Sequence, residues 1–349
     1  MPHLTKRNVF GALAAAGLIA LAAGTAAAQQ PTNIRFTLGW KTQGSDAAFF
    51  VARDKGYFAR EGLNVTIDQG EGSGATVTRI MGGAYDAGFG DINAIIQNAA
   101  ANPGMAPVMV YQMWNQPPFA IVARNSSGIK TIKDFEGKTL GGAQGTPTTR
   151  LMPVFARVNG LDLSKIRFTN MAPNLQEPML IQGHMDAAMV FNITSYFNLV
   201  GLNQDPDKDY TWFSFADFGM DLYSNGMMVS QRLLRENPRA VQGLVRAVSQ
   251  ATIDVGRDIA GAMASVRRYD QLVDMNVEQR RLRFAYEKLM VSAEGREIGA
   301  GDVKDDRLAR AIDMVVQGYG LTRTPAPSEI FNRSFLPPRA ERELVYLAN

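Results

Sequence analysis

The chain has 349 residues, of which 46% are hydrophobic and 20% charged, which is ordinary globular composition. The formal net charge is only +3 and there is no basic cluster with interleaved aromatic residues, so the sequence predicts no nucleic-acid partner. The absence of cysteine excludes disulfides, thiolate metal sites, a cysteine nucleophile and a lipidated N-terminal cysteine.

Segment 1–28 has the pattern of a secretory signal peptide. Lys6 and Arg7 precede the apolar run 9–23, and alanines 26–28 provide the small residues of a cleavage site. A retained membrane anchor is the alternative, because the uncharged stretch is about long enough to span a bilayer. We predict cleavage, a net charge of +1 without the two basic residues, and a soluble protein in the periplasm.

The next part of the chain alternates short apolar strands with helices. This alternation predicts an α/β fold with a parallel sheet that helices cover on both faces. In chain order, the expected elements are strand 34–38, helix 47–55, strand 64–68, helix 76–81, strand 87–90, a helix opened by 91–93, and strands 108–113 and 120–123.

The turn cluster Asn125–Gly128 marks the expected crossing into a second lobe. Thr146 followed by Pro147 predicts a helix start, with an N-cap residue and proline at the first helical position. Strands are expected at 166–169 and 187–191, and a return strand at 226–230. The later helical stretches should pack on the first lobe; they are 239–269, 278–289 and 306–317.

One pattern occurs twice in the chain, about 100 residues apart. The first copy reads Phe58-Ala59-Arg60, Gly62-Leu63 and then Gly83-x-x-Asp86-Ala87; the second reads Phe155-Ala156-Arg157, Gly160-Leu161 and then Gly183-x-x-Asp186-Ala187. That spacing is the size of a small lobe. We therefore predict two Rossmann-like lobes with a hinge and a ligand cleft between them, formed by residues 29–123 plus 228–349 and by residues 124–227.

Helix starts and strand ends supply the candidate ligand-binding residues. In open α/β sheets, ligands bind at the carboxyl ends of strands, where helix N-termini offer free N–H groups. Aromatic residues at the same ends can form cleft walls. The candidates are Trp40, Asp46, Ser73, Gly74, Asp91, Asn93, Trp114, Thr146, Thr148, Asn174 and Phe191. Each polar candidate could instead only cap its own helix, and each aromatic could only pack in the core.

Asp46 and Asp91 bring negative charge to the expected cleft. A bare oxyanion would be repelled unless Lys41 or Arg150 offset them, whereas a ligand with N–H or hydroxyl donors would suit them. The predicted ligand is therefore a small polar organic solute with an aromatic or heterocyclic ring and hydrogen-bond donors.

Two enzymatic alternatives stay open at this stage. Residues 70–75 read Gly-Glu-Gly-Ser-Gly-Ala, which matches the G-x-G-x-x-A pattern of NAD-binding oxidoreductases, with Asp91 near the position of their ribose-binding acid. An exported hydrolase would have to build a Ser–His–Asp triad on His184, since His3 lies in the signal. The sequence predicts no metal site and no cofactor, because one histidine without cysteine makes a poor zinc site.

Several passages resemble periplasmic solute-binding proteins of ABC transporters, of the nitrate/sulfonate/taurine and thiamine-pyrimidine type. They are Trp40 with Ala48-Phe49-Phe50-Val51-Ala52-Arg53-Asp54-Lys55-Gly56-Tyr57-Phe58-Ala59-Arg60-Glu61-Gly62-Leu63-Asn64-Val65, then 83–90, 127–138 and 330–337. The resemblance implies a type II periplasmic binding fold, capture of a solute in the cleft and delivery to an ABC permease.

The resemblance also maps ligand loops onto this chain, which adds Ala75 and Asn192 to the candidates. Asp46 stands where family members often carry histidine, and the cysteine run of the yeast-type pyrimidine synthases is absent. We therefore predict a monomeric binding protein with no catalytic residues that is not an enzyme. Its partners would be a small-molecule solute and the membrane subunits of an importer.

Overall fold

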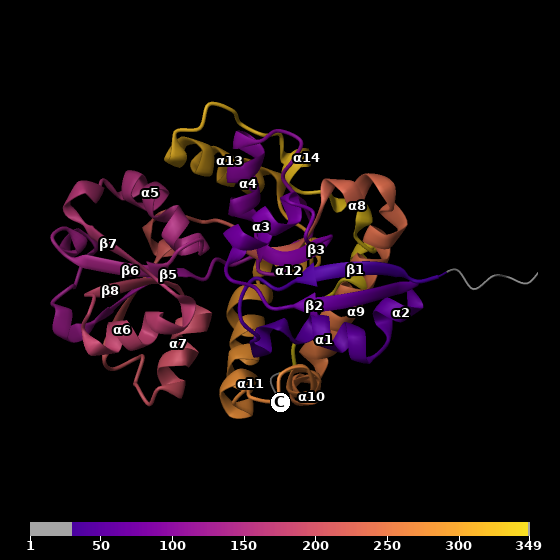
Figure 1. The fold of residues 1–349 in the computed structure, drawn as a ribbon, viewed down its shortest axis with the longest axis horizontal. Coiled ribbons are helices and arrows are strands. Elements are labelled where there is room, and N and C mark those ends of the chain that lie inside the picture. The colour runs from indigo at the N-terminus through magenta and orange to yellow at the C-terminus, as the bar shows by residue number, and fades with distance from the viewer. Residues whose placement is uncertain (1–29, 348–349) are drawn as a thin grey trace, which may run out of the picture. The chain divides into compact units, whose positions relative to one another are not determined.

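The computed structural model describes residues 30–347, so the predicted signal peptide lies outside the described residues. Residues from Thr32 onward form one compact unit, which contains two five-stranded sheets with helices around each (Figure 1). Within residues 30–347, no helix combines the length and apolar character that crossing a membrane requires. The predicted fold class, α/β with two sheet-centred halves, is confirmed.

The first sheet has the strand order β2-β1-β3-β10-β4. β1 pairs in parallel with β2 and β3, whereas β10 is antiparallel to β3 and β4, so the sheet is mixed rather than parallel as predicted. Its strands are β1 (Thr32–Thr37), β2 (Leu63–Asp68), β3 (Ala87–Asp91), β4 (Val108–Tyr111) and β10 (Asn225–Val229). All residues of β3, β4 and β10 are buried, which explains their continuous apolar and glycine-rich runs.

The second sheet has the order β7-β6-β8-β5-β9 and the same pattern of directions. β6 is parallel to β7 and β8, and β5 is antiparallel to β8 and β9. The strands are β5 (Phe119–Arg124), β6 (Thr139–Ala143), β7 (Arg167–Met171), β8 (Ala187–Phe191) and β9 (Tyr210–Ser214). Sequence reasoning missed β6 and β9, neither of which has a clear apolar alternation.

The repeated Gly-x-x-Asp-Ala motif performs the same task in both sheets. The Asp86 carboxylate accepts the backbone N–H of Arg35 at 2.9 Å, and the Asp186 carboxylate accepts that of Thr139 at 2.8 Å. Each aspartate also donates its own N–H to the carbonyl of the same partner, at 2.9 Å. The aspartate thus pins the start of one strand to the neighbouring strand, which accounts for its recurrence.

The strand predicted at 120–123 belongs to the other half of the molecule. We placed it in the first lobe, before a crossing at Asn125–Gly128; the structure places it in β5, paired with β8 and β9 of the second sheet. The chain therefore leaves the first sheet after Tyr111. An apolar run does not specify its pairing partners, because hydrogen bonds between strands are set by tertiary contacts.

Short connections join these strands to helices on both faces of each sheet (Figure 1). Around the first sheet lie α1 (Ala47–Asp54), α2 (Tyr57–Arg60), α3 (Ser73–Met81), α4 (Ile92–Ala101), α8 (Gln231–Glu236), α9 (Pro238–Arg257) and α10 (Ile259–Tyr269). Around the second lie α5 (Pro147–Asn159), α6 (Gln176–Gln182) and α7 (Asn192–Gly201). The predicted helix 239–269 is two helices, because Asp258 leaves the helical conformation and caps α10 by accepting the N–H of Gly261.

The last helices are α11 (Met275–Phe284), which continues as a π-helix (Ala285–Met290), α12 (Ala293–Ile298), α13 (Asp305–Tyr319) and α14 (Pro327–Ile330). Two of them, α11 and α13, contact both halves rather than the first alone. α11 packs against α10 of the first half and α7 of the second, and α13 packs against α4 and α5. The buried apolar cores on either side are therefore joined through these helices.

Candidate ligand-binding site

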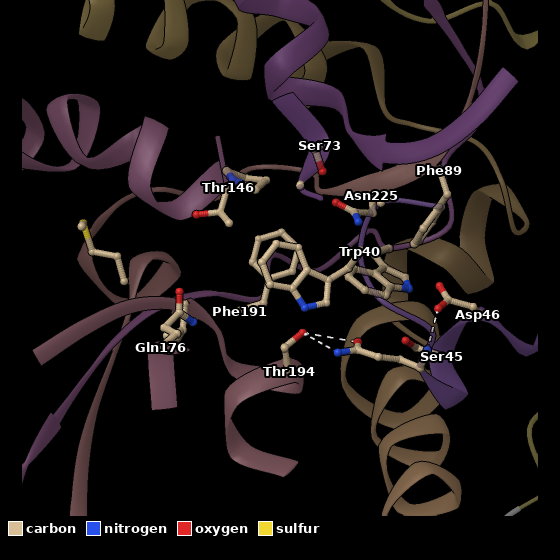
Figure 2. A pocket seen from close by; sticks show the side chains of 17 residues that line it. Trp40, Ser45, Asp46, Ser73, Phe89, Thr146, Gln176, Phe191, Thr194 and Asn225 are labelled. Carbon is tan, nitrogen blue, oxygen red and sulfur yellow. Dashed lines mark hydrogen bonds between the residues drawn. The ribbon is translucent and has the colours of Figure 1, made fainter. Parts of the chain in front are cut away.

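A pocket lies where loops from the first sheet meet loops and strand ends from the second (Figure 2). Its cavity volume is about 50 Å³. This is several times the roughly 10–15 Å³ that one water molecule needs. Its lining residues are Gly39, Trp40, Gln43, Ser45, Asp46, Gly72, Ser73, Phe89, Trp114, Thr146, Pro147, Gln176, Met189, Val190, Phe191, Thr194 and Asn225.

Aromatic rings form much of the wall. Trp114 lies edge-on to Phe89, with ring centroids 5.3 Å apart, and 6.1 Å from the ring of Phe191. These rings come from both sheets, since Phe89 is in β3 and Phe191 ends β8. Trp40, three residues after the end of β1, is half-buried and adds a fourth ring. Such walls favour flat, apolar ligand surfaces.

Trp114 carries a donor that the described part of the chain leaves unsatisfied. Its side chain is only 3% exposed, and its Nε1–H has no hydrogen-bond partner among residues 30–347. A buried N–H without an acceptor costs about 1–3 kcal/mol. The nitrogen itself is buried, so we expect a ligand acceptor to reach it and supply the missing partner only when the neighbouring side chains shift.

Replacing Trp114 with phenylalanine tests this role. The ring contacts to Phe89 and Phe191 remain while the unpaired N–H disappears, so the melting temperature should change by only a few degrees. The ligand affinity should fall roughly tenfold, as measured by calorimetric titration. Equal affinities of variant and wild type would show that Nε1 does not contact the ligand.

Asp46 is the charged residue of the pocket. It ends the short 3-10 helix η1 (Gly44–Asp46), directly before α1, and it is only 6% exposed. Its Oδ2 accepts the backbone N–H of Gln43 at 2.9 Å. Burial raises the pKa of Asp46 to about 7, and the nearby Glu278 adds to the rise while Arg281 opposes it. The carboxyl group is therefore poised to exchange a proton near neutral pH.

The raised pKa of Asp46 predicts how stability depends on pH. The folded state binds the proton of Asp46 more tightly than the unfolded chain does, and this proton binding stabilises the folded state. The stabilisation from the protonated carboxyl group is complete below about pH 3.8 and is lost as the pH rises through about 7. At pH 8, the free energy of unfolding of Asp46→Asn should therefore exceed that of wild type by on the order of a few kcal/mol. Near pH 4 the two proteins should be equally stable. Urea unfolding at both pH values measures this, and a constant difference would contradict the raised pKa.

The two halves are hydrogen-bonded to each other at the pocket edges. Gln43 Nε2 donates to Thr194 Oγ1 at 3.3 Å, which connects the loop before η1 to α7 (Figure 2). Gly74 N donates to Gly145 O at 3.1 Å, between the starts of α3 and α5. Gly72 at φ 110° adopts a conformation that only glycine takes readily, and this brings the two loops into contact.

The structure brings together six of the predicted site residues. Those that line the pocket are Trp40, Asp46, Ser73, Trp114, Thr146 and Phe191. Seven do not line it: Gly74, Ala75, Asp91, Asn93, Thr148, Asn174 and Asn192. Their binding roles stay predictions, and the structure gives several of them other partners.

The residues outside the pocket have identifiable local tasks. Asp91 caps α4 by accepting the N–H groups of Asn93 and Ala94, and Thr148 Oγ1 donates to Val190 O at 2.7 Å. Asn192 Oδ1 accepts the N–H of Ile193, and Asn174 is exposed. Asp91 thus fits the capping role that we considered as the alternative, whereas Asn174 lies before Leu175, the N-cap residue of α6.

Asp91, Asn93 and Arg150 line a second, much smaller cavity of about 10 Å³. Burial raises the pKa of Asp91 to about 7, although its hydrogen bonds from Asn93 oppose the rise. Neither Arg150 nor Lys41 lines the main pocket, whereas Arg150 lines the smaller cavity together with Asp91.

Sequence reasoning missed several polar lining residues, notably Gln43, Gln176, Thr194 and Asn225. Gln176 was two positions from the predicted Asn174, and the proline of the 3-10 helix η5 (Pro173–Leu175) delays the start of α6 to Gln176. Gln43 lies three residues before Asp46, so widening that motif toward the N-terminus would have found it.

The dinucleotide alternative does not suit the glycine-rich loop. Its N–H groups already have protein acceptors: Gly70 donates to Trp40 O, Gly72 to Gly39 O and Gly74 to Gly145 O. A pyrophosphate needs such groups free. His184 of the hydrolase alternative is exposed on the turn after α6 beside Gln182, away from the pocket. Within the described residues, no group of three or more His, Cys, Asp or Glu could hold a metal ion.

The chain belongs to the NMT1/THI5-like family, whose model matches residues 44–258. The matched span is more than half of the chain and includes η1, β2 to β10 and most of the pocket lining. This confirms the family resemblance drawn from the sequence motifs.

Two curated relatives are named 4-amino-5-hydroxymethyl-2-methylpyrimidine phosphate synthase. The one from Schizosaccharomyces pombe is 23% identical over 234 residues, which cover 65% of this chain and 66% of that protein. The one from Aspergillus parasiticus is 26% identical over 255 residues, or 70% of each chain. The chain thus spans just under two thirds of the fission yeast protein. A synthase is an enzyme, so the prediction that this protein is not an enzyme is wrong by this comparison.

Solved periplasmic binding proteins share the fold. The alkanesulfonate-binding protein of Xanthomonas axonopodis pv. citri, bound to MOPS, has a TM-score of 0.65 at 17% identity and covers 87% of this chain and 99% of its own. The periplasmic nitrate-binding protein of Synechocystis has a TM-score of 0.61 at 13% identity, with 86% and 84% covered. At these identities the likeness shows the fold alone.

Proposed function

We propose that the protein is the periplasmic solute-binding component of an ABC importer, which captures a small polar organic molecule in the pocket and delivers it to a membrane permease. The ligand would carry an aromatic or heterocyclic ring with hydrogen-bond donors. The family membership, the periplasmic-binding fold and the predicted export signal support the proposal.

One observation carries the choice of ligand. Of the 17 residues that line the pocket, the only one with a charged side chain is Asp46, and none is lysine, arginine or histidine. A buried carboxylate without a lining cation repels sulfonate or nitrate and accepts hydrogen bonds from amino groups. The rings of Trp40, Phe89, Trp114 and Phe191 favour a flat partner for those donors.

The names of the curated relatives suggest a concrete probe. 4-Amino-5-hydroxymethyl-2-methylpyrimidine has a flat ring, an amino donor and ring-nitrogen acceptors, which match Asp46 as acceptor and Trp114 Nε1 as donor. It is therefore our first candidate for the ligand class of aminopyrimidines.

The test is isothermal titration of the protein with this pyrimidine, its phosphate, taurine and nitrate. We expect micromolar or tighter binding of the pyrimidine and no heat from taurine or nitrate. Tight binding of taurine or nitrate with none of the pyrimidine would refute the ligand class. If none of the four binds, mass spectrometry of the denatured protein would identify a ligand that already occupies the pocket.

A second candidate is the synthase activity named in the curated relatives. The observation that favours it is that the two alignments extend over 65% and 70% of this chain. Expression of the chain in cells that need 4-amino-5-hydroxymethyl-2-methylpyrimidine for growth tests it. Growth without the added pyrimidine would establish the synthase, whereas growth that still needs trace pyrimidine but at a lower concentration would favour uptake.

A further inference from the structure

A buried ion pair on α11 lies between the two halves beside the pocket. Arg281 is only 2% exposed and forms a two-point contact with Glu278, with Nε to Oε2 at 2.9 Å and Nη2 to Oε1 at 3.0 Å. The two residues are three positions apart on one helix, so the carboxylate holds the guanidinium in a fixed orientation.

The remaining donors of Arg281 reach the second half of the molecule. Nη1 donates to the carbonyl oxygens of Ile193 and Thr194, both at 2.8 Å, and Nη2 donates to Asn198 Oδ1 at 3.0 Å. All three acceptors belong to α7, which follows β8 of the second sheet. The guanidinium also lies over the ring of Phe197, 5.5 Å from its centroid.

The other end of the pair holds a pocket wall of the first half. Glu278 Oε2 accepts the backbone N–H of Gly44 at 2.6 Å, two residues before Asp46. Thr194, whose carbonyl binds Arg281, itself lines the pocket and exchanges hydrogen bonds with Gln43. One ion pair therefore touches both walls of the pocket.

We infer that Arg281 and Glu278 form a latch that holds the halves closed over the pocket, with Arg281 as a positioning residue. If the halves separate, the pair stays intact within α11, while Arg281 loses all three acceptors on α7. Water replaces these acceptors once the surfaces part, so the latch can open without leaving a charge buried and unpaired.

The latch is distinct from the contact on the opposite side of the pocket. There, Tyr319 of α13 donates to the carbonyl of Arg150, and Arg157 donates to the carbonyl of Gln317. The Arg157 contact is exposed, whereas the hydrogen bonds of Nη1 of Arg281 are buried. Losing the latch should therefore shift the balance toward an open form without separating the halves completely.

Distance measurements between spin labels on the two halves test the inference without any ligand, so the outcome does not depend on the proposed function. The chain has no cysteine, so Asn170→Cys and Arg239→Cys provide unique labelling sites in the full chain. Both positions are exposed, one on β7 and the other on α9.

We expect Arg281→Lys to raise the ratio of long to short distances roughly tenfold, because lysine cannot reproduce the forked contact. Asn198→Ala should give a smaller rise of about threefold and leaves the ion pair intact. Arg257→Lys, an exposed arginine at the end of α9, is the matched control and should change nothing.

If Arg281 only stabilised the fold, its replacement would lower the melting temperature without changing the distances between the two labels in the folded protein. Unchanged distances in folded Arg281→Lys would overturn the latch. If that variant does not fold, Asn198→Ala decides: a longer distance population supports the latch, and the wild-type distribution overturns it.

Discussion

Asp46→Asn is expected to weaken binding of 4-amino-5-hydroxymethyl-2-methylpyrimidine by roughly 10- to 100-fold at pH 8, because a charge-assisted hydrogen bond becomes a neutral one. The effect should depend on pH. With the pKa of Asp46 near 7 in the free protein, the wild-type affinity should rise as pH increases from 6 to 8, as the carboxyl group ionises. The affinity of Asp46→Asn should lack this rise. Calorimetric titration at several pH values measures both.

Asp91→Asn is the matched control for this experiment. Asp91 is equally buried and its pKa is also raised to about 7, but it lies outside the main pocket. Its replacement should preserve the pH dependence of affinity. If Asp91→Asn rather than Asp46→Asn removes the rise, the ligand contacts the smaller cavity and the proposed role of Asp46 is wrong.

Gly44→Ala should lower the free energy of unfolding by about 3 kcal/mol or more. A Cβ atom at position 44 would lie 2.1 Å from the carbonyl oxygen of Glu278, which is backbone and has little freedom to yield. The change would also displace the N–H of Gly44 from the Glu278 carboxylate. Chemical denaturation followed by circular dichroism gives the free energy of unfolding.

Gly201→Ala is the control for the effect of the added methyl group. Position 201 ends α7, and nothing lies within 4 Å of a Cβ atom placed there. Alanine favours helix over glycine by up to about 1 kcal/mol, so this variant should equal or slightly exceed wild type in stability. A Gly44→Ala variant as stable as Gly201→Ala would mean that α11 does not pack closely on η1.

The local structure around the pocket was largely predictable from the sequence. Apolar runs of four to six residues gave most strands, and Thr146-Pro147 marked the start of α5 correctly. Trp40, Trp114 and Phe191 were chosen because they lie at or just after expected strand ends, and all three line the pocket. The positions of strand ends and helix starts depend on the conformational and capping preferences of residues that are close in sequence, so a short stretch of chain is enough to predict them.

Long-range pairing decided the remaining features. The run 120–123 looks the same whichever sheet it joins, and only its hydrogen bonds with β8 and β9 assign it to the second. Arg281 reads as one of several helical arginines, yet it is buried between halves that are far apart in sequence. The pKa of Asp46 likewise rises because surrounding segments exclude water from it. The sequence by itself determined the elements and the class of fold, whereas burial and contacts between distant segments, which short-range preferences do not encode, determined the pocket, its charge and the latch.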